Sequence, residues 1–115
     1  MSDESFATLP EPPYYAVIFT IRRSAVAGNE YESVGARMVE LTLEQPGCLG
    51  IEGVGDASGF EMTVCYWKDE AAIRAWKQHA EHLVAQQLGR DKFFQRYEIK
   101  IARVERAYGS SGTVR

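Results

Sequence analysis

The residues with the clearest chemical potential lie on one predicted helix, which runs from Asp69 to about Leu88. Trp76 and His79 are three positions apart, so they share one stripe of that helix. An imidazole titrates near neutral pH and can act as a general base, whereas an indole offers a flat apolar wall and one N–H donor. His82 lies further round the helix and is expected to meet water. The alternative is structural: Trp76 anchors the core, and His79 bonds a neighbouring carbonyl or water.

Aromatic and apolar residues on other elements could complete a site for a small molecule. Tyrosine hydroxyls can donate to a developing oxyanion, and aliphatic or aromatic side chains can form the lining of a dry pocket. Packing in the core or in an interface is the alternative for the tyrosines. The candidate catalytic base is His79, and the candidate substrate-binding residues are Trp76, Tyr66, Tyr97, Met38, Phe19 and Leu83.

A metal site is another interpretation of the same helix. His79 and His82 are an i, i+3 pair, and Glu81, Cys48 and Cys65 are conceivable further ligands. No motif supplies a third ligand at a fixed spacing, and the two imidazoles are expected to point in different directions. We therefore expect no metal.

Hydrophobic periodicity predicts six elements that would position these residues. Strands are expected over 14–22, 48–54, 62–67 and 97–104, and helices over 29–45 and 69–88. Asn29 and Asp69 are the predicted helix N-caps. Gly50 and Gly53 are expected at a bulge or at a close approach of another backbone. The alternation of the last strand slips near Ala102 and Arg103, which predicts a β-bulge there.

The element order β-α-β-β-α-β predicts an α+β, ferredoxin-like sandwich. In this fold a four-stranded antiparallel sheet carries two helices on one face. Two helices cover only one side of the sheet, yet the strands at 14–22 and 62–67 are apolar on both sides. An apolar sheet face of several hundred Å² requires a partner. We therefore expect a homodimer that closes sheet to sheet.

Composition narrows the class of protein. A chain of 115 residues with 45% hydrophobic content forms one domain. The net charge of −3 argues against nucleic-acid binding, which needs clustered basic residues. No apolar run approaches the roughly 20 residues of a membrane span, and the N-terminal residues do not resemble a signal peptide. A cytoplasmic location is the expectation, and Cys48 and Cys65 are then expected as free thiols.

The chain resembles the antibiotic biosynthesis monooxygenase (ABM) family of dimeric α+β barrels. Three segments carry the resemblance: QPGCLG at 45–50, TVCYWKDEAAIRAW at 63–76 and RYEIKIARVERAY at 96–108. The resemblance implies a ferredoxin-fold domain over 14–108. The polar residues on either side are expected to form a flexible N-terminal arm (1–13) and a flexible C-terminal tail (109–115). It also implies a cavity between sheet and helices, and cofactor-independent oxygenation of a small aromatic, quinol or polyketide-like substrate.

Another branch of the family and a non-catalytic function remain as alternatives. Trp76 falls where the haem-degrading branch has its pocket tryptophan, but the first strand lacks that branch's asparagine and Gln86 stands near its histidine position. Haem degradation is therefore less expected than oxygenation. The main alternative is a non-catalytic dimer of the same fold that binds a small molecule or serves in assembly.

Overall fold

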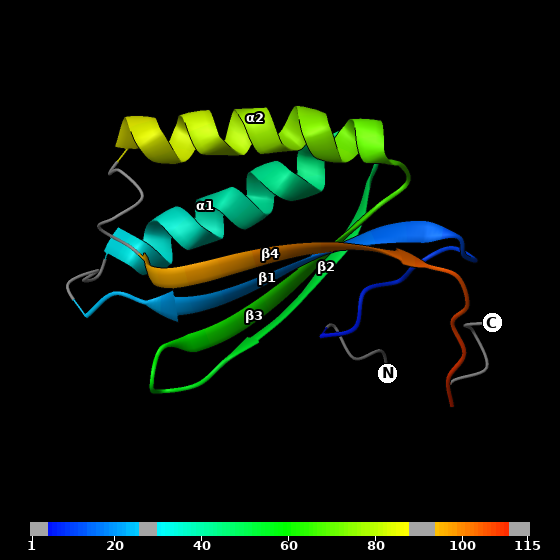
Figure 1. Cartoon of the computed structure of the whole chain (residues 1–115), viewed down its shortest axis with the longest axis horizontal. Helices are drawn as coiled ribbons and strands as arrows, with labels where there is room; N and C mark the ends of the chain where they lie inside the picture. Colours follow the sequence, from blue (N-terminus) through cyan, green and yellow to red (C-terminus); the bar gives the residue numbers. More distant parts are fainter. Residues whose placement is uncertain (1–4, 26–29, 88–93, 111–115) are drawn as a thin grey trace.

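The computed structural model describes residues 5–25, 30–87 and 94–110, and within them the side chains of all but residues 30 and 81–87. The predicted element order is confirmed. The elements are β1 (Tyr14–Arg23), α1 (Glu30–Glu44), β2 (Cys48–Gly55), β3 (Phe60–Trp67), α2 (Glu70–Gln87) and β4 (Phe94–Val104). Both helices lie on one face of the sheet, with α1 against β2 and α2 against β3 (Figure 1).

The sheet has the strand order β2-β3-β1-β4, and all its pairings are antiparallel. The predicted bulge at Ala102 and Arg103 is wrong, because β4 pairs with β1 without interruption from Val104 to Arg96. The register shift falls instead between Arg22 and Arg23, at the far end of this pairing. The apparent slip in the sequence has a simpler origin: an alanine and an arginine occupy positions on a strand that is exposed on both faces.

The register assigns each strand residue to one face of the sheet. On the helix side, Phe19 lies between Thr63 of β3 and Ile99 of β4. On the helix-free side, Ala16 lies between Tyr66 and Ala102. Successive side chains of a strand point to opposite faces. The faces of all remaining residues of β1, β3 and β4 therefore follow from these two rows by alternation.

The centre of the packing between helices and sheet is Trp67, the most deeply buried large side chain at 1% exposure. Ile73 of α2 and Ile21 of β1 are also buried. α1 carries an apolar stripe whose members are half-buried, and Thr42 beside them is buried. The members of that stripe are Tyr31, Val34, Met38 and Leu41.

The described part of the N-terminal segment lies against the helix-free side of the sheet. The backbone N–H of Ala7 donates to Glu52 of β2 at 3.0 Å. A Cβ added at Gly50 would lie 2.9 Å from the Ala7 Cβ, so the absence of a side chain at Gly50 lets the segment approach. Gly50 also follows a register shift between β2 and β3. Both predicted roles of Gly50 are therefore confirmed, whereas the flexibility of residues 1–13 and 109–115 stays a prediction.

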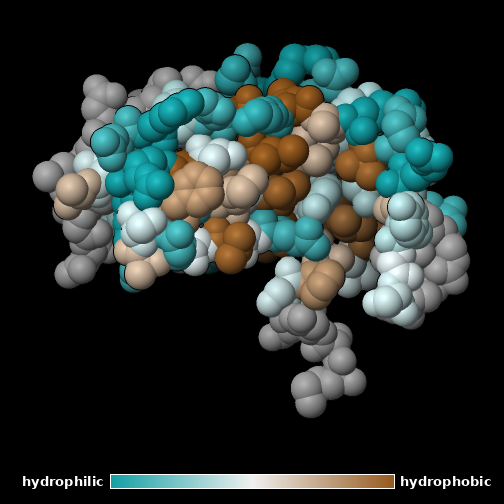
Figure 2. All heavy atoms as spheres, turned by 60° about the horizontal axis from the view of Figure 1, so that its bottom comes forward, coloured by the Kyte–Doolittle hydropathy of each residue, from teal (hydrophilic) through white to brown (hydrophobic). Residues whose placement is uncertain are grey.

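Much of the helix-free side remains bare. Val54, Phe60 and Met62 are 74%, 39% and 38% exposed, and Ile18 and Val64 are half-buried beside them. Figure 2 turns this side forward and shows hydrophobic residues gathered in the middle of the face, with hydrophilic residues around them. We call Ile18, Val54, Phe60, Met62 and Val64 the helix-free patch. These side chains form an apolar face that the helices leave uncovered, as the sequence predicted. That a second copy covers this face stays a prediction.

No helix among the described residues is long and apolar enough to cross a membrane.

Candidate functional site

The start of α2 determines where Trp76 and His79 lie. Asp69 accepts a hydrogen bond from the backbone N–H of Ala72 at 2.8 Å, which confirms the predicted N-cap. A Cβ added at Gly47, whose φ is 89°, would lie 2.7 Å from the Ala72 Cβ. The first turn of α2 therefore sits close to the loop before β2, and Trp76 follows one turn later.

Trp76 and His79 are in contact, as their shared stripe predicts. Their ring centroids are 5.3 Å apart and their planes are inclined by 54°. The two residues differ in burial: Trp76 is half-buried, whereas His79 is exposed. The least exposed positions of the described part of this helix are Ala72, Ile73, Trp76 and Ala80. His79 thus stands at the edge of the buried stripe, exposed to solvent.

The helix side of β4 carries a row of exposed apolar side chains. Tyr97, Ile99 and Ile101 are 38%, 47% and 53% exposed. They pair with Ile21, Phe19 and Val17 of β1 and so point toward the side that the helices cover. We call Tyr97, Ile99 and Ile101 the helix-side strip. Because α2 packs on β3, the strip remains accessible although it belongs to the helix-covered face.

Aromatic rings adjoin one end of the helix-side strip. Phe19 contacts Phe94 and Tyr97, with ring centroids 5.8 Å apart in both pairs. Phe94 also contacts Tyr97 at 5.6 Å and Tyr31 of α1 at 6.3 Å. We call Phe19, Tyr31, Phe94 and Tyr97 the aromatic cluster. Phe19 and Tyr97 were predicted site residues, and the structure brings them together.

A carboxylate and a guanidinium flank the aromatic cluster. The Tyr31 hydroxyl donates to Glu61 of β3 at 2.5 Å, and the Arg23 guanidinium lies 5.2 Å from the centroid of the Tyr31 ring. Burial, and secondly the bond to Glu61, raises the pKa of Tyr31, against a smaller lowering by the Arg23 charge. Tyr31 is therefore a protonated donor at neutral pH. Sequence reasoning did not select Tyr31, Glu61, Phe94 or Arg23, because they come together only through the strand register and the placement of α1 on the sheet.

Tyr66 lies on the opposite side of the sheet from the aromatic cluster. Its hydroxyl donates to Glu52 at 2.6 Å, and its ring meets that of Tyr14 edge to face at 5.7 Å. Burial, and then the bond to Glu52, raises the pKa of Tyr66. Of the two predicted hydroxyl donors, only Tyr97 shares the helix side with Phe19.

The remaining predicted residues contribute less to the described geometry. Met38 is half-buried on α1, and the side chains of Leu83 and His82 lie outside the described residues. Cys48 and Cys65 are free thiols, as expected. Burial raises the pKa of Cys65 to about 12, with a smaller contribution from Cys48. Within the described ranges no group of three potential ligands is arranged to hold a metal ion.

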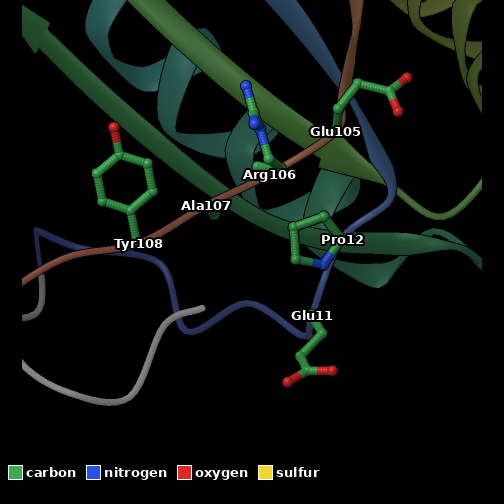
Figure 3. Close-up of a pocket in the computed structure, with 6 residues that line it drawn as sticks. All are labelled: Glu11, Pro12, Glu105, Arg106, Ala107 and Tyr108. Carbon is green, nitrogen blue, oxygen red and sulfur yellow. The ribbon is translucent and has the colours of Figure 1, made fainter.

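A shallow hollow of about 300 Å³ lies away from all of these residues. It is lined by Glu11, Pro12, Glu105, Arg106, Ala107 and Tyr108, from the segments before β1 and after β4 (Figure 3). None of the predicted site residues lines it. Its lining side chains are largely exposed, so it lacks the apolar enclosure of a small-molecule site.

Comparison with known proteins finds a matching protein family and a relative in sequence. A family model described as antibiotic biosynthesis monooxygenase matches residues 14–88. The uncharacterized protein YqjZ of Bacillus subtilis is 43% identical over 97 residues, which are 84% of each chain.

Solved structures at lower identity show the same fold. The chain is similar to PA3566 from Pseudomonas aeruginosa, with a TM-score of 0.65 and 22% identity over 86% of this chain and 99% of that one. It is also similar to SnoaB, a cofactor-independent oxygenase from Streptomyces nogalater, with a TM-score of 0.63 and 17% identity over 86% of this chain and all of that one.

Proposed function

The chain belongs to the antibiotic biosynthesis monooxygenase family, and from that premise we propose that it is a cofactor-independent monooxygenase. Its proposed substrate is a small aromatic, quinol or polyketide-like molecule that packs on the helix-side strip. The observation that carries the proposal is that Tyr97, Ile99 and Ile101 stay exposed on the side that the helices cover. Support also comes from the fold shared with SnoaB, itself a cofactor-independent oxygenase.

The proposed reaction is the conversion of an activated methylene, as in an anthrone, to a carbonyl. A base removes one methylene proton, and the resulting carbanion donates electrons to O₂. One oxygen atom enters the carbonyl, and the other leaves as water with the two methylene hydrogens. The carbon loses four electrons and O₂ gains four, so the reaction requires no external reductant.

His79 is the proposed base and Trp76 the proposed wall beside the substrate. The exposed imidazole can release the captured proton to solvent, and its contact with Trp76 places it next to a flat apolar surface. Tyr97 is the proposed hydroxyl donor to the developing oxyanion, because it lies at the junction of the helix-side strip and the aromatic cluster. Met38, Leu83 and Tyr66 remain predictions as binding residues.

The proposal includes a homodimer closed through the helix-free patch, and a cytoplasmic location. The patch supplies the apolar centre that a stable interface needs, and charged residues of the edge strand β4 border it on one side. Among these, Glu98 lies within ion-pair distance of Arg96 and Lys100, and both contacts are exposed. An interface of about 800 Å² per partner is typical of stable dimers, and such interfaces have an apolar centre and a polar rim. We therefore expect these charged residues to form part of its rim.

A non-catalytic dimer that binds a small molecule or serves in assembly is the second candidate function. The exposure of His79 favours it, because a catalytic base normally works in a site from which water is largely excluded. Under this alternative the helix-side strip holds a ligand, and no oxygen is consumed.

Oxygen uptake separates the two functions. The wild type is supplied with an anthrone and, separately, a quinol, and O₂ consumption is followed with an electrode. We expect catalysed uptake in the wild type, a loss of about 100-fold or more in kcat for His79→Ala, and a raised KM for Trp76→Phe. Gln78→Ala, an exposed neighbour on α2, is the control and should match the wild type. Equal rates in all variants, or no uptake with any substrate, would remove the catalytic claim.

A further inference from the structure

A short N-terminal segment, residues 5–9, lies on the helix-free side of the sheet, and we call it the strap. The peptide group between Phe6 and Ala7 is held at β2, because the Ala7 N–H donates to Glu52 Oε2 at 3.0 Å. Gly50, two residues before Glu52, leaves space for the Ala7 side chain. Figure 1 shows the segment turning back from the start of β1 beneath the sheet, on the side away from the helices. The strap is thus held at a defined place on the sheet.

The carboxylate that holds the strap is itself held in place. Glu52 Oε1 accepts a hydrogen bond from the Tyr66 hydroxyl at 2.6 Å, which leaves Oε2 for the Ala7 N–H. The Tyr66 ring meets the Tyr14 ring edge to face at 5.7 Å, and Tyr14 is only 4% exposed. Glu52 is therefore a preorganised acceptor, since its orientation depends on a packed aromatic pair and not on the strap.

The strap has an inward and an outward side. Ala7 and Leu9 are half-buried beside Gly50, whereas Phe6 and Thr8 are exposed. This alternation is typical of an extended segment that lies on a surface. Phe6 is 71% exposed, so most of its ring does not pack on its own sheet. An aromatic side chain can bury roughly 150–250 Å², so Phe6 offers roughly 100–180 Å² of apolar surface to a partner.

The strap borders the helix-free patch. Glu52 pairs with Val64 of β3, and Val54 is the next residue of β2 that points to the same side. Both valines belong to the patch, and Val54 is 74% exposed. A second copy that covers these valines therefore comes alongside the strap and meets its outward side. A stable dimer buries about 800 Å² per partner, of which Phe6 can supply about a tenth or more.

We propose that the strap is part of the dimer interface and that Phe6 of each copy packs against the helix-free patch of the other copy. A two-fold dimer buries the same surface of both copies, so this contact occurs twice. Glu52 is a positioning residue, because it orders the strap before association and so reduces the entropy lost on binding. The inference rests on the homodimer of the proposed function and adds a segment outside the patch to its interface. It does not require oxygenation.

The test is the dissociation constant of the dimer, measured by sedimentation equilibrium. Phe6→Ala should raise this Kd about 10-fold or more, because the apolar contact is lost from both copies. Glu52→Ala should raise it by a similar factor, because the strap is no longer held. Glu52→Gln should stay within about 3-fold of the wild type, since its amide oxygen can accept from Ala7 while its NH₂ group donates to Tyr66. Leu43→Ala, at an exposed apolar position of α1, is the control and should leave Kd unchanged.

A double variant shows whether Glu52 acts through Phe6. Two independent losses would multiply, so Phe6→Ala/Glu52→Ala would then raise Kd about 100-fold. If Glu52 acts by holding Phe6 in place, the double variant should show the same increase as each single variant, about 10-fold. A 100-fold increase would overturn the positioning role of Glu52.

Amide hydrogen exchange at Ala7 measures the attachment of the strap directly. The Ala7 N–H should exchange slowly in the wild type and in Phe6→Ala, and rapidly in Glu52→Ala, because only Glu52→Ala lacks the acceptor. Phe6→Ala changes an exposed side chain, so it tests the interface even if Glu52→Ala disturbs the fold. Rapid exchange in the wild type, an unchanged Kd in Phe6→Ala, or a lower Kd in Glu52→Ala would overturn the proposal. The last result would make the strap a cover that competes with the second copy.

The same measurements distinguish failure of the homodimer from failure of the strap. A wild type that stays monomeric at all concentrations would reject both. A wild-type dimer whose Kd is the same in Phe6→Ala would retain the homodimer and reject the role of the strap. Neither result depends on oxygen uptake, so the oxygenase is tested independently.

Discussion

Single residues show which contacts the helical and strand periods of the sequence can predict and which they cannot. The contact between Trp76 and His79 could be predicted from their spacing, because a helix brings i and i+3 together regardless of the rest of the fold. The Tyr31–Glu61 bond joins residues 30 positions apart, so it depends on how α1 lies over the sheet. Helical and strand periods carry no information about that placement. The Tyr31–Glu61 contact was therefore not predicted, whereas the Trp76–His79 contact was.

Cys65 gives a residue-scale prediction on pH dependence. Its pKa is about 12 in the folded protein, against a reference value of 9.0, mainly because of burial. Between pH 9 and 12 the unfolded thiol ionises first, so the free energy of unfolding should fall as pH rises through that window. The loss attributable to this thiol should reach about 1 kcal/mol by pH 10. Urea unfolding at pH 8 and pH 10 measures it.

The matched variant for this prediction is Cys65→Ala, which removes the titrating group. Its free energy of unfolding should change less between pH 8 and 10 than that of the wild type. An identical pH dependence in both proteins would show that Cys65 ionises equally in the folded and unfolded states.

At the scale of elements, the Asp69 cap and most of the alternation of the strands were predictable from local sequence, while the predicted cap Asn29 lies outside the described residues. Asp69 caps α2, and this effect acts within one helical turn. The segment that approaches Gly50 contains Ala7, which is far away in the sequence, so local sequence showed only that a close approach was possible there. The face assignment of Tyr66 followed from the register of β3 against β1, which no local pattern specifies. The accessible strip on β4 arises because α2 packs on β3, and this is also a tertiary property.

The N-cap of α2 provides the element-scale prediction. Asp69→Ala removes the acceptor for the Ala72 N–H and should lower the free energy of unfolding by about 1 kcal/mol. Asp69→Asn retains a side-chain oxygen that can accept the same bond, so it should lose only a few tenths of that value. Chemical denaturation of the three proteins measures the effect. Equal stability of Asp69→Ala and wild type would mean that the cap does not stabilise the start of α2.

For the whole molecule, the proposed function gives different roles to two apolar surfaces of one sheet. In that proposal the helix-free patch binds a second copy, and the helix-side strip binds the ligand. Their separation follows from the register, since Met62 pairs with Thr20 on one face and Ile101 pairs with Val17 on the other. A charge placed on one surface should therefore disturb one function and spare the other. The sequence predicted two apolar faces, but only the strand positions show which side chains belong to each.

Sedimentation velocity with 1-naphthol, recorded at a protein wavelength and at a ligand wavelength, tests this division most directly. The wild type should sediment as a dimer that carries the ligand, Met62→Glu as a monomer, and Ile101→Glu as a dimer that has lost the ligand. Leu43→Glu, on an exposed apolar position of α1, should behave as the wild type. A wild type that sediments as a monomer, a Met62→Glu protein that remains dimeric, or an Ile101→Glu dimer that still carries the naphthol would contradict the account.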